Sequence, residues 1–84
     1  MAVYSVSQIT AYLRQVLDYD ILLQDLWVSG EVANLSRPGS GHSYFTLREA
    51  GKSLRSVMFR TAIGAERLDD GAAVIAHGRI SIYE

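Results

Sequence analysis

The 84-residue sequence predicts one small domain that is mainly β and begins with an α-helix. Near the N-terminus, apolar residues recur at the spacing of a helix face, and from about residue 26 they alternate with polar residues, as in strands. Short runs rich in Gly, Asp, Ser and Pro separate the alternating segments. Hydrophobic residues make up 49% of the chain and cysteine is absent, so packing alone must hold the core together.

The predicted helix covers about residues 6–18. Its apolar positions recur at steps of three, four, three and one along one face, at Val6, Ile9, Leu13, Val16 and Leu17. Ser5 and Gln8 have the spacing of a capping box, in which each side chain bonds a backbone amide at the helix start. The helix therefore carries its own start signal.

The first predicted strand begins at about residue 26. Gly30 interrupts its alternating pattern, and a lone glycine inside a strand indicates a bulge or a sharp bend. We expect Trp27, at the start of this strand, to pack against the N-terminal helix. An exposed tryptophan would instead be a good partner for a cation.

The loop SRPGSG, residues 36–41, leads into a second strand over residues 42–48. Alternation along this strand places Phe45 and Leu47 toward the core and Tyr44 and Arg48 on the opposite face. Residues 49–52 form a tight hairpin, and residues 53–60 return as a third strand. The third strand is apolar on both faces, so its register stays open.

Residues 61–68 predict a short helix, residues 69–71 a turn and residues 73–83 a fourth strand. The resulting order of elements matches the first four-fifths of an OB-fold, a five-stranded Greek-key barrel whose second and third strands bind oligonucleotides. We therefore predict a single OB-fold domain over residues 1–84 that lacks its closing strand. The unpaired edge of the fourth strand would invite pairing between chains.

Charge is distributed unevenly along a chain whose net charge is −1. Residues 1–36 sum to −3 and residues 61–84 to −2, whereas residues 37–60 carry five cations against Glu49 and sum to +4. A basic centre between acidic flanks indicates a surface for a polyanion such as nucleic acid.

Proteins that bind single strands combine such a basic surface with aromatic rings on which bases stack. Tyr44 is our first choice for a stacking ring and Phe59 the second, although a phenylalanine is more often buried. His42 could donate to a phosphate or simply order the loop. The full set of candidate binding residues is Arg37, His42, Tyr44, Arg48, Lys52, Arg55, Phe59, Arg60 and Arg79.

The sequence predicts no catalytic, metal or cofactor site. His42 and His77 have no cysteine or carboxylate cluster at ligand spacing, and Asp69-Asp70-Gly71 indicates a turn rather than a catalytic pair of acids. The sequence has neither a signal peptide nor a membrane-spanning stretch. We therefore expect a cytoplasmic protein without a membrane partner.

The sequence resembles the N-terminal domain of the large subunit of bacterial exodeoxyribonuclease VII from about Tyr4 to Glu84. The resemblance is carried by WVSGEVANLSRPGSGHSYFTL, VMFR and GRISIYE in this order and spacing. It implies an OB-fold that binds single-stranded DNA ahead of a catalytic domain outside these 84 residues. It also implies the activity of the family, degradation of single-stranded DNA to oligonucleotides, and many copies of a small subunit as partners.

Two other functions remain open at this stage. The chain could be a protein-interaction or assembly module that pairs through open strand edges, as an edge-paired or domain-swapped homodimer. It could also hydrolyse DNA by itself, but no set of acid, base or metal-binding residues supports that function.

Overall fold

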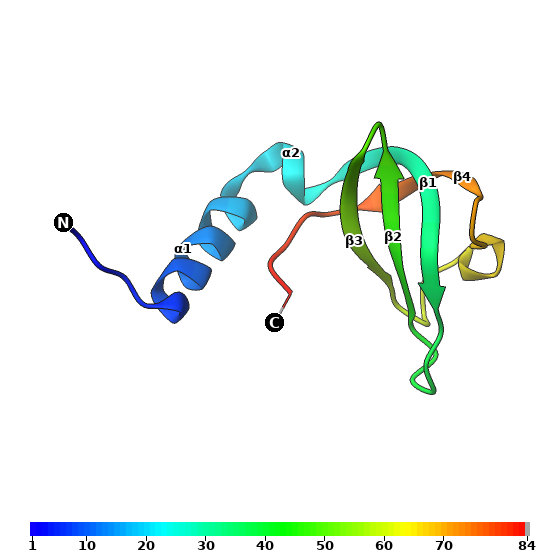
Figure 1. Ribbon diagram of the computed structural model, residues 1–84, viewed down its shortest axis with the longest axis horizontal. Coiled ribbons are helices and arrows are strands. Elements are labelled where there is room, and N and C mark those ends of the chain that lie inside the picture. The colour runs from blue at the N-terminus through cyan, green and yellow to red at the C-terminus, as the bar shows by residue number, and fades with distance from the viewer. Residues whose placement is uncertain (84) are drawn as a thin grey trace. The chain divides into compact units, whose positions relative to one another are not determined.

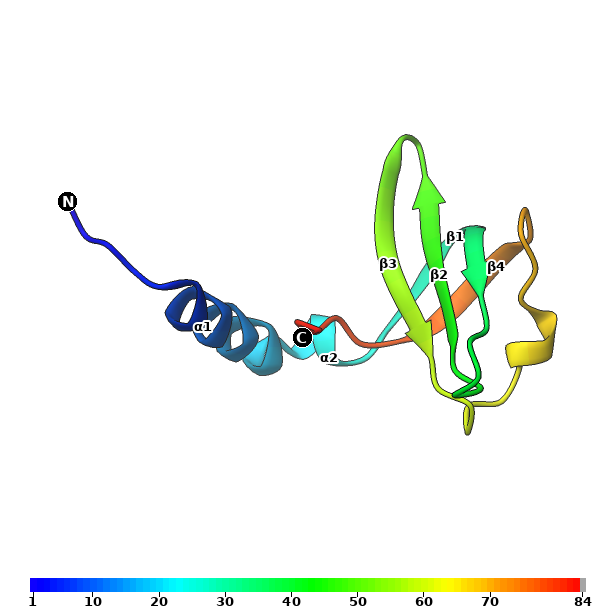
Figure 2. The same cartoon turned by 60° about the horizontal axis from the view of Figure 1, so that its bottom comes forward.

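The structure is a computed structural model that describes residues 1–83 and is mainly β with an N-terminal helix, as the sequence predicts (Figure 1). Its elements in chain order are α1 (Val6–Tyr19), α2 (Ile21–Gln24), β1 (Leu26–Ser36), β2 (Ser43–Glu49), β3 (Lys52–Met58), the 3₁₀ turn η1 (Ala65–Arg67) and β4 (Ala73–Gly78). The strands form one sheet in the order β3-β2-β1-β4 (Figure 2). Within the described residues no strand joins the edges β3 and β4, as in an OB-fold without its closing strand.

The backbone gathers into two compact units, one of residues 28–76 and one that combines residues 1–27 with the segment from His77 onward. The unit of residues 28–76 holds the hydrophobic core. Its buried apolar side chains are Val32, Phe45, Leu47 and Leu68, and those packed partly against them are Val28, Leu35, Met58, Val74 and Ala76. Phe45 and Leu47 thus face the core, as the alternation along β2 predicts.

The pairing of β2 with β3 settles the register that the sequence leaves open. Leu47 lies opposite Leu54 and Ser43 opposite Met58, so Leu54 and Met58 share the core side of the sheet. Arg55 lies opposite Thr46 on the other side. Val57, the apolar residue of β3 on that second face, is half-buried.

The bulge in β1 lies further along the strand than predicted. The register with β2 shifts between Ala33 and Ser36, and Asn34 there has a positive φ of 55°, which asparagine tolerates better than most residues. Gly30 stays in the strand. A Cβ at residue 30 would lie 2.8 Å from Cγ of Leu47, so this glycine provides room for a core side chain.

The β2–β3 hairpin turns through Ala50 and Gly51, as predicted for residues 49–52. Both residues have a positive φ, 51° and 77°, and Glu49 pairs with Lys52 across the turn. This two-residue turn matches the right-handed twist of the flanking strands. The alanine, however, occupies a conformation that suits asparagine or glycine better.

The other unit contains α1 and α2. The predicted capping box is confirmed, because Ser5 Oγ accepts the N–H of Gln8 at 3.1 Å and Gln8 Oε1 accepts the N–H of Ser5 at 2.8 Å. The helix ends at Tyr19, one residue later than predicted. Neither helix in residues 1–83 has the length and apolar character that crossing a membrane requires.

Two predictions about this unit are wrong. The fourth strand ends at Gly78 rather than Tyr83, because the segment that follows bonds to the helices: Ile80 N–H donates to the carbonyl of Leu23 at 2.8 Å and Arg14 donates to that of Ile82 at 3.4 Å. Trp27 is not buried against the N-terminal helix, since 68% of its surface is exposed.

Candidate nucleic-acid interface

The face of β2 and β3 that points away from the core is here called the outer face. Its cross-strand pairs, read from one end to the other, are Tyr44 with Val57, Thr46 with Arg55, and Arg48 with Ser53. Successive pairs lie about 6.8 Å apart along the strands, because residues on one face alternate. The side chains of Tyr44, Thr46 and Arg48 on β2 therefore lie one after another along the outer face, with Arg55 of β3 beside Thr46.

Arg55 lies near the middle of the outer face. Its Nη1 donates weakly to Oγ1 of Thr46 at 3.4 Å, and no carboxylate pairs with it anywhere in residues 1–83. The remaining guanidinium donors of this exposed side chain are available to an anion. Tyr44 lies one cross-strand pair away, half-buried and opposite Val57, on the face predicted for it.

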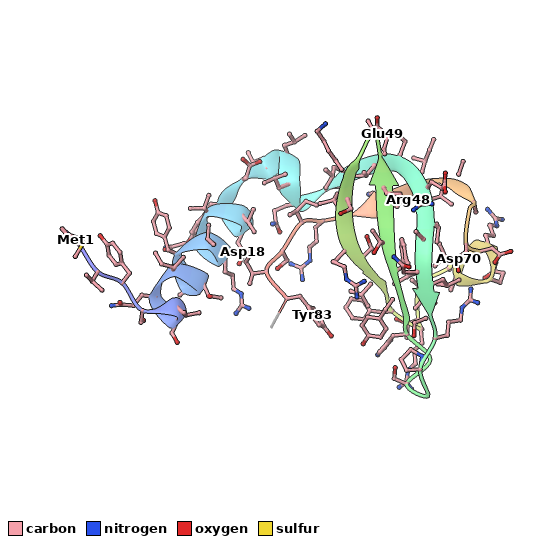
Figure 3. All side chains as sticks on the ribbon, viewed as in Figure 1. Met1, Asp18, Arg48, Glu49, Asp70 and Tyr83 are labelled. Carbon is pink, nitrogen blue, oxygen red and sulfur yellow. The ribbon has the colours of Figure 1, made fainter. Side chains whose placement is uncertain are left out.

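Arg48 differs from Arg55 because it is already paired. Its Nη2 lies 2.9 Å from Oε1 of Glu31 on the neighbouring strand β1. Figure 3 shows Arg48 beside β1 and Glu49 at the hairpin end of β2. Lys52 lies opposite Glu49 at the same end, so each cation there has a carboxylate close by. The hairpin end consequently carries less net positive charge than the middle of the outer face.

This end also contains a shallow hollow of about 350 Å³. It is lined by Glu31, Arg48, Glu49, Ala50, Gly51, Lys52 and Ser53. Two carboxylates and two cations share its lining, so the hollow offers a phosphate no net attraction. The ion pair between Arg48 and Glu31 was not predicted from the sequence. The alternating pattern of β1 does place Glu31 on the same face of the sheet as Arg48.

A cluster of His42, Phe59 and Arg60 lies at the opposite end of β2 and β3. Nδ1 of His42 accepts the backbone N–H of Arg60 at 3.0 Å, and the imidazole meets the ring of Phe59 edge to face with centroids 5.4 Å apart. In the neutral imidazole this leaves Nε2 as the donor. His42 thus orders the loop through Nδ1, and its predicted role as a phosphate donor stays a prediction.

Phe59 is 53% exposed, so its ring is available for stacking rather than buried in the core, the commoner arrangement for phenylalanine. Arg60 is also exposed, and it contacts the loop before β2. A Cβ at Gly41 would approach Cβ of Arg60 at 3.4 Å. The cluster thus combines an open aromatic face with a cation.

Two other predicted site residues lie apart from this row. Nη2 of Arg37 donates to the carbonyls of Ala65 at 2.9 Å and Leu68 at 3.0 Å, so its guanidinium binds the η1 segment rather than pointing away from it. Arg79 follows β4 and belongs to the unit that contains the helices. The structure therefore brings together Tyr44, Arg48, Arg55 and Lys52 on β2 and β3, with His42, Phe59 and Arg60 at the strand ends.

The two neighbouring acids Asp69 and Asp70 bond to backbone amides. Oδ1 of Asp70 accepts the N–H of Leu35 at 2.9 Å, next to the bulge of β1, and Oδ1 of Asp69 accepts the N–H of Asp70 at 3.0 Å. Among residues 1–83 no three His, Asp or Glu side chains gather as a metal-binding group.

Comparison with known proteins agrees with the OB-fold that the sheet shows. The family described as OB-fold nucleic acid binding domain matches residues 4–84. The exodeoxyribonuclease 7 large subunits of Geotalea daltonii and Moorella thermoacetica are 46% and 44% identical to this chain over 98% and 96% of its length. That of Pseudomonas fluorescens is 42% identical over 98%. The chain spans 18%, 21% and 18% of these three relatives. It belongs to the family of OB-fold nucleic acid binding domains.

Proposed function

We propose that this chain is the module that binds single-stranded DNA in an exodeoxyribonuclease VII large subunit. Its role is to present the strand to a catalytic domain that lies outside these 84 residues and degrades the DNA to oligonucleotides. The family match and the identity to exodeoxyribonuclease 7 large subunits support this function. The observation that carries it is the outer face, where Arg55 has no carboxylate partner in the described residues and Phe59 exposes its ring at the strand ends.

A single strand fits this face better than a duplex. An exposed ring stabilises a base only when that base is unstacked from its neighbours, as bases are in single strands. The cations are few, and two of them lie beside carboxylates, so electrostatic attraction alone would be weak. Stacking on Phe59 and Tyr44 together with a phosphate on Arg55 combines the two contributions that single-strand binders use.

The test is fluorescence anisotropy of a labelled oligothymidylate titrated with this chain at low and moderate salt, with unlabelled duplex as competitor. We expect selective binding to the single strand. The logarithm of the association constant should fall with the logarithm of salt concentration by about 0.7 for each phosphate contacted.

Arg55→Ala should weaken binding about fivefold, equivalent to roughly 1 kcal/mol, and lower the salt slope by about 0.7. Phe59→Ala should weaken binding with little change in that slope, because it removes stacking and no charge. Arg67→Ala is the matched control, since it removes an exposed arginine from η1 instead of from the sheet. Equal effects of the two arginine substitutions, or equal affinity for duplex, would refute this assignment of the site.

A second function is favoured by the edges of the sheet. Among the described residues β3 and β4 each have a strand neighbour on one side only. An open edge can pair with a strand of a partner, whether a second copy of this chain or the small subunit of the nuclease. Light scattering of the purified chain tests the first case, and a mass of twice the monomer at micromolar concentration would support it.

The expected compartment follows from the proposed substrate. A module that handles chromosomal DNA in a bacterium acts in the cytoplasm.

A further inference from the structure

The unit that contains the helices carries an aromatic stack outside the outer face. Trp27 near the start of β1 and His77 near the end of β4 have parallel rings, with centroids 4.2 Å apart and an interplanar angle of 8°. Two adjacent strands thus hold their aromatic side chains face to face.

The imidazole is fixed at its edge as well as on its face. Oδ1 of Asp25, the residue that follows α2 as its C-cap, bonds to Nε2 of His77. This contact occupies a ring nitrogen and sets the plane of the imidazole, and the indole stacks on that plane. The orientation of Trp27 is therefore defined, although the side chain lies at the surface.

One face of the indole remains open. His77 covers the other face, yet 68% of Trp27 is still exposed to solvent. If a second side chain packed on the free face, only the edges of the indole would be accessible to solvent. The exposed fraction of Trp27 would then be much lower than it is. The stack on His77 holds this exposed ring in one orientation, so its free face can receive a flat ligand.

We propose that the free face of Trp27 is a stacking platform for a nucleobase of single-stranded DNA. A nucleobase suits it because the surface is flat, aromatic and indifferent to sequence, since every base has a π face. The carboxylate of Asp25 would repel a phosphate, so this contact is made by a base rather than by the backbone. Arg79, exposed two residues beyond His77, supplies positive charge to the same segment. The platform rests on the function proposed above and extends it to a second part of the chain.

Trp27 is the only tryptophan in the sequence, so its emission reports on this site alone. The experiment adds unlabelled oligothymidylate to the unmodified chain at low salt and follows tryptophan emission, in parallel with the anisotropy of a labelled oligothymidylate. A base that stacks on the indole quenches its fluorescence. We expect the emission to fall with the same midpoint as the rise in anisotropy.

Substitutions separate a binding role from a structural one. Trp27→Ala should weaken binding about tenfold, whereas Trp27→Phe, which retains a smaller stacking ring, should weaken it less. Tyr19→Ala is the matched control because it removes another exposed aromatic ring from the same unit. Circular dichroism of each variant establishes that the fold is retained.

The outcomes distinguish the two proposals. Rising anisotropy with unchanged tryptophan emission, and with parental affinity of the Trp27→Ala variant, would overturn the platform and leave the outer face as the binding site. No rise in anisotropy with folded chain at low salt would overturn the proposed function and the platform with it. Coincident quenching and a selective loss of affinity in the Trp27 variants would establish both.

Discussion

Gly30→Ala should destabilise the protein because the core lies directly against the backbone of β1. The new Cβ would lie 2.8 Å from Cγ and 3.1 Å from Cδ1 of Leu47, and 3.2 Å from the carbonyl oxygen of Arg48. Leu47 is only 5% exposed and cannot move into solvent. Overpacking of this kind costs about 1–3 kcal/mol, and the lower chain entropy of alanine offsets about 0.5–1 kcal/mol of it. The expected net loss in the free energy of unfolding is about 1–2 kcal/mol.

Urea and thermal unfolding followed by circular dichroism measure this loss. In a domain of this size it corresponds to a fall in Tm of roughly 4–16 °C. Gly39→Ala is the control, because a Cβ at residue 39 meets nothing within 4 Å and this glycine does not have a positive φ. The control should be neutral or more stable by up to about 1 kcal/mol.

A larger side chain extends the same test. Gly30→Val should destabilise more than Gly30→Ala, since it adds two further carbon atoms against Leu47. The reasoning is refuted if the alanine substitutions at residues 30 and 39 give equal unfolding free energies.

Two further predictions concern the hairpin and its neighbouring ion pair. Ala50→Asn should raise the free energy of unfolding, measured in urea, by about 0.5–1 kcal/mol. Asparagine tolerates the positive φ of residue 50, and Asn-Gly favours this type of turn. A loss of stability would contradict this prediction. Glu31→Gln should increase the affinity for labelled oligothymidylate about twofold at low salt, because it removes the carboxylate paired with Arg48 and such exposed pairs are weak. In an Arg48→Ala background, Glu31→Gln should change the affinity less. An equal change would show that the gain in affinity does not come from Arg48.

Features set by local chain chemistry could be predicted from the sequence. The capping box of Ser5 and Gln8, the hairpin at residues 49–52 and the inward direction of Phe45 and Leu47 each depend on a few neighbouring residues. The order of the elements was then enough to indicate the fold. The register of β3 was not predictable, because both of its faces carry apolar residues and only pairing with β2 distinguishes them.

Features that depend on partners distant in the sequence were missed. The pattern at Gly30 indicates a bulge or a sharp bend, but it cannot show the packing of Leu47 against this glycine, because Leu47 lies on another strand. Trp27 stacks on His77, which is 50 residues away, and the segment that follows β4 bonds to α2 through Ile80 and Leu23. The sequence shows the basic residues of the proposed site but not the groups to which two of them bond. Arg37 bonds two carbonyls and Arg48 bonds Glu31, and neither contact leaves a local pattern.

The loop between β1 and β2 is anchored at both ends. Arg37 fastens its start to the η1 segment, and the bond from the N–H of Arg60 to His42 fastens its end. Immobilising a mobile side chain on binding costs about 0.5–1.5 kcal/mol, and a loop that is fixed beforehand avoids that cost. A preorganised loop also removes a folding step from the association rate. In the proposed complex it is then the DNA strand, rather than the protein loop, that gives up conformational freedom.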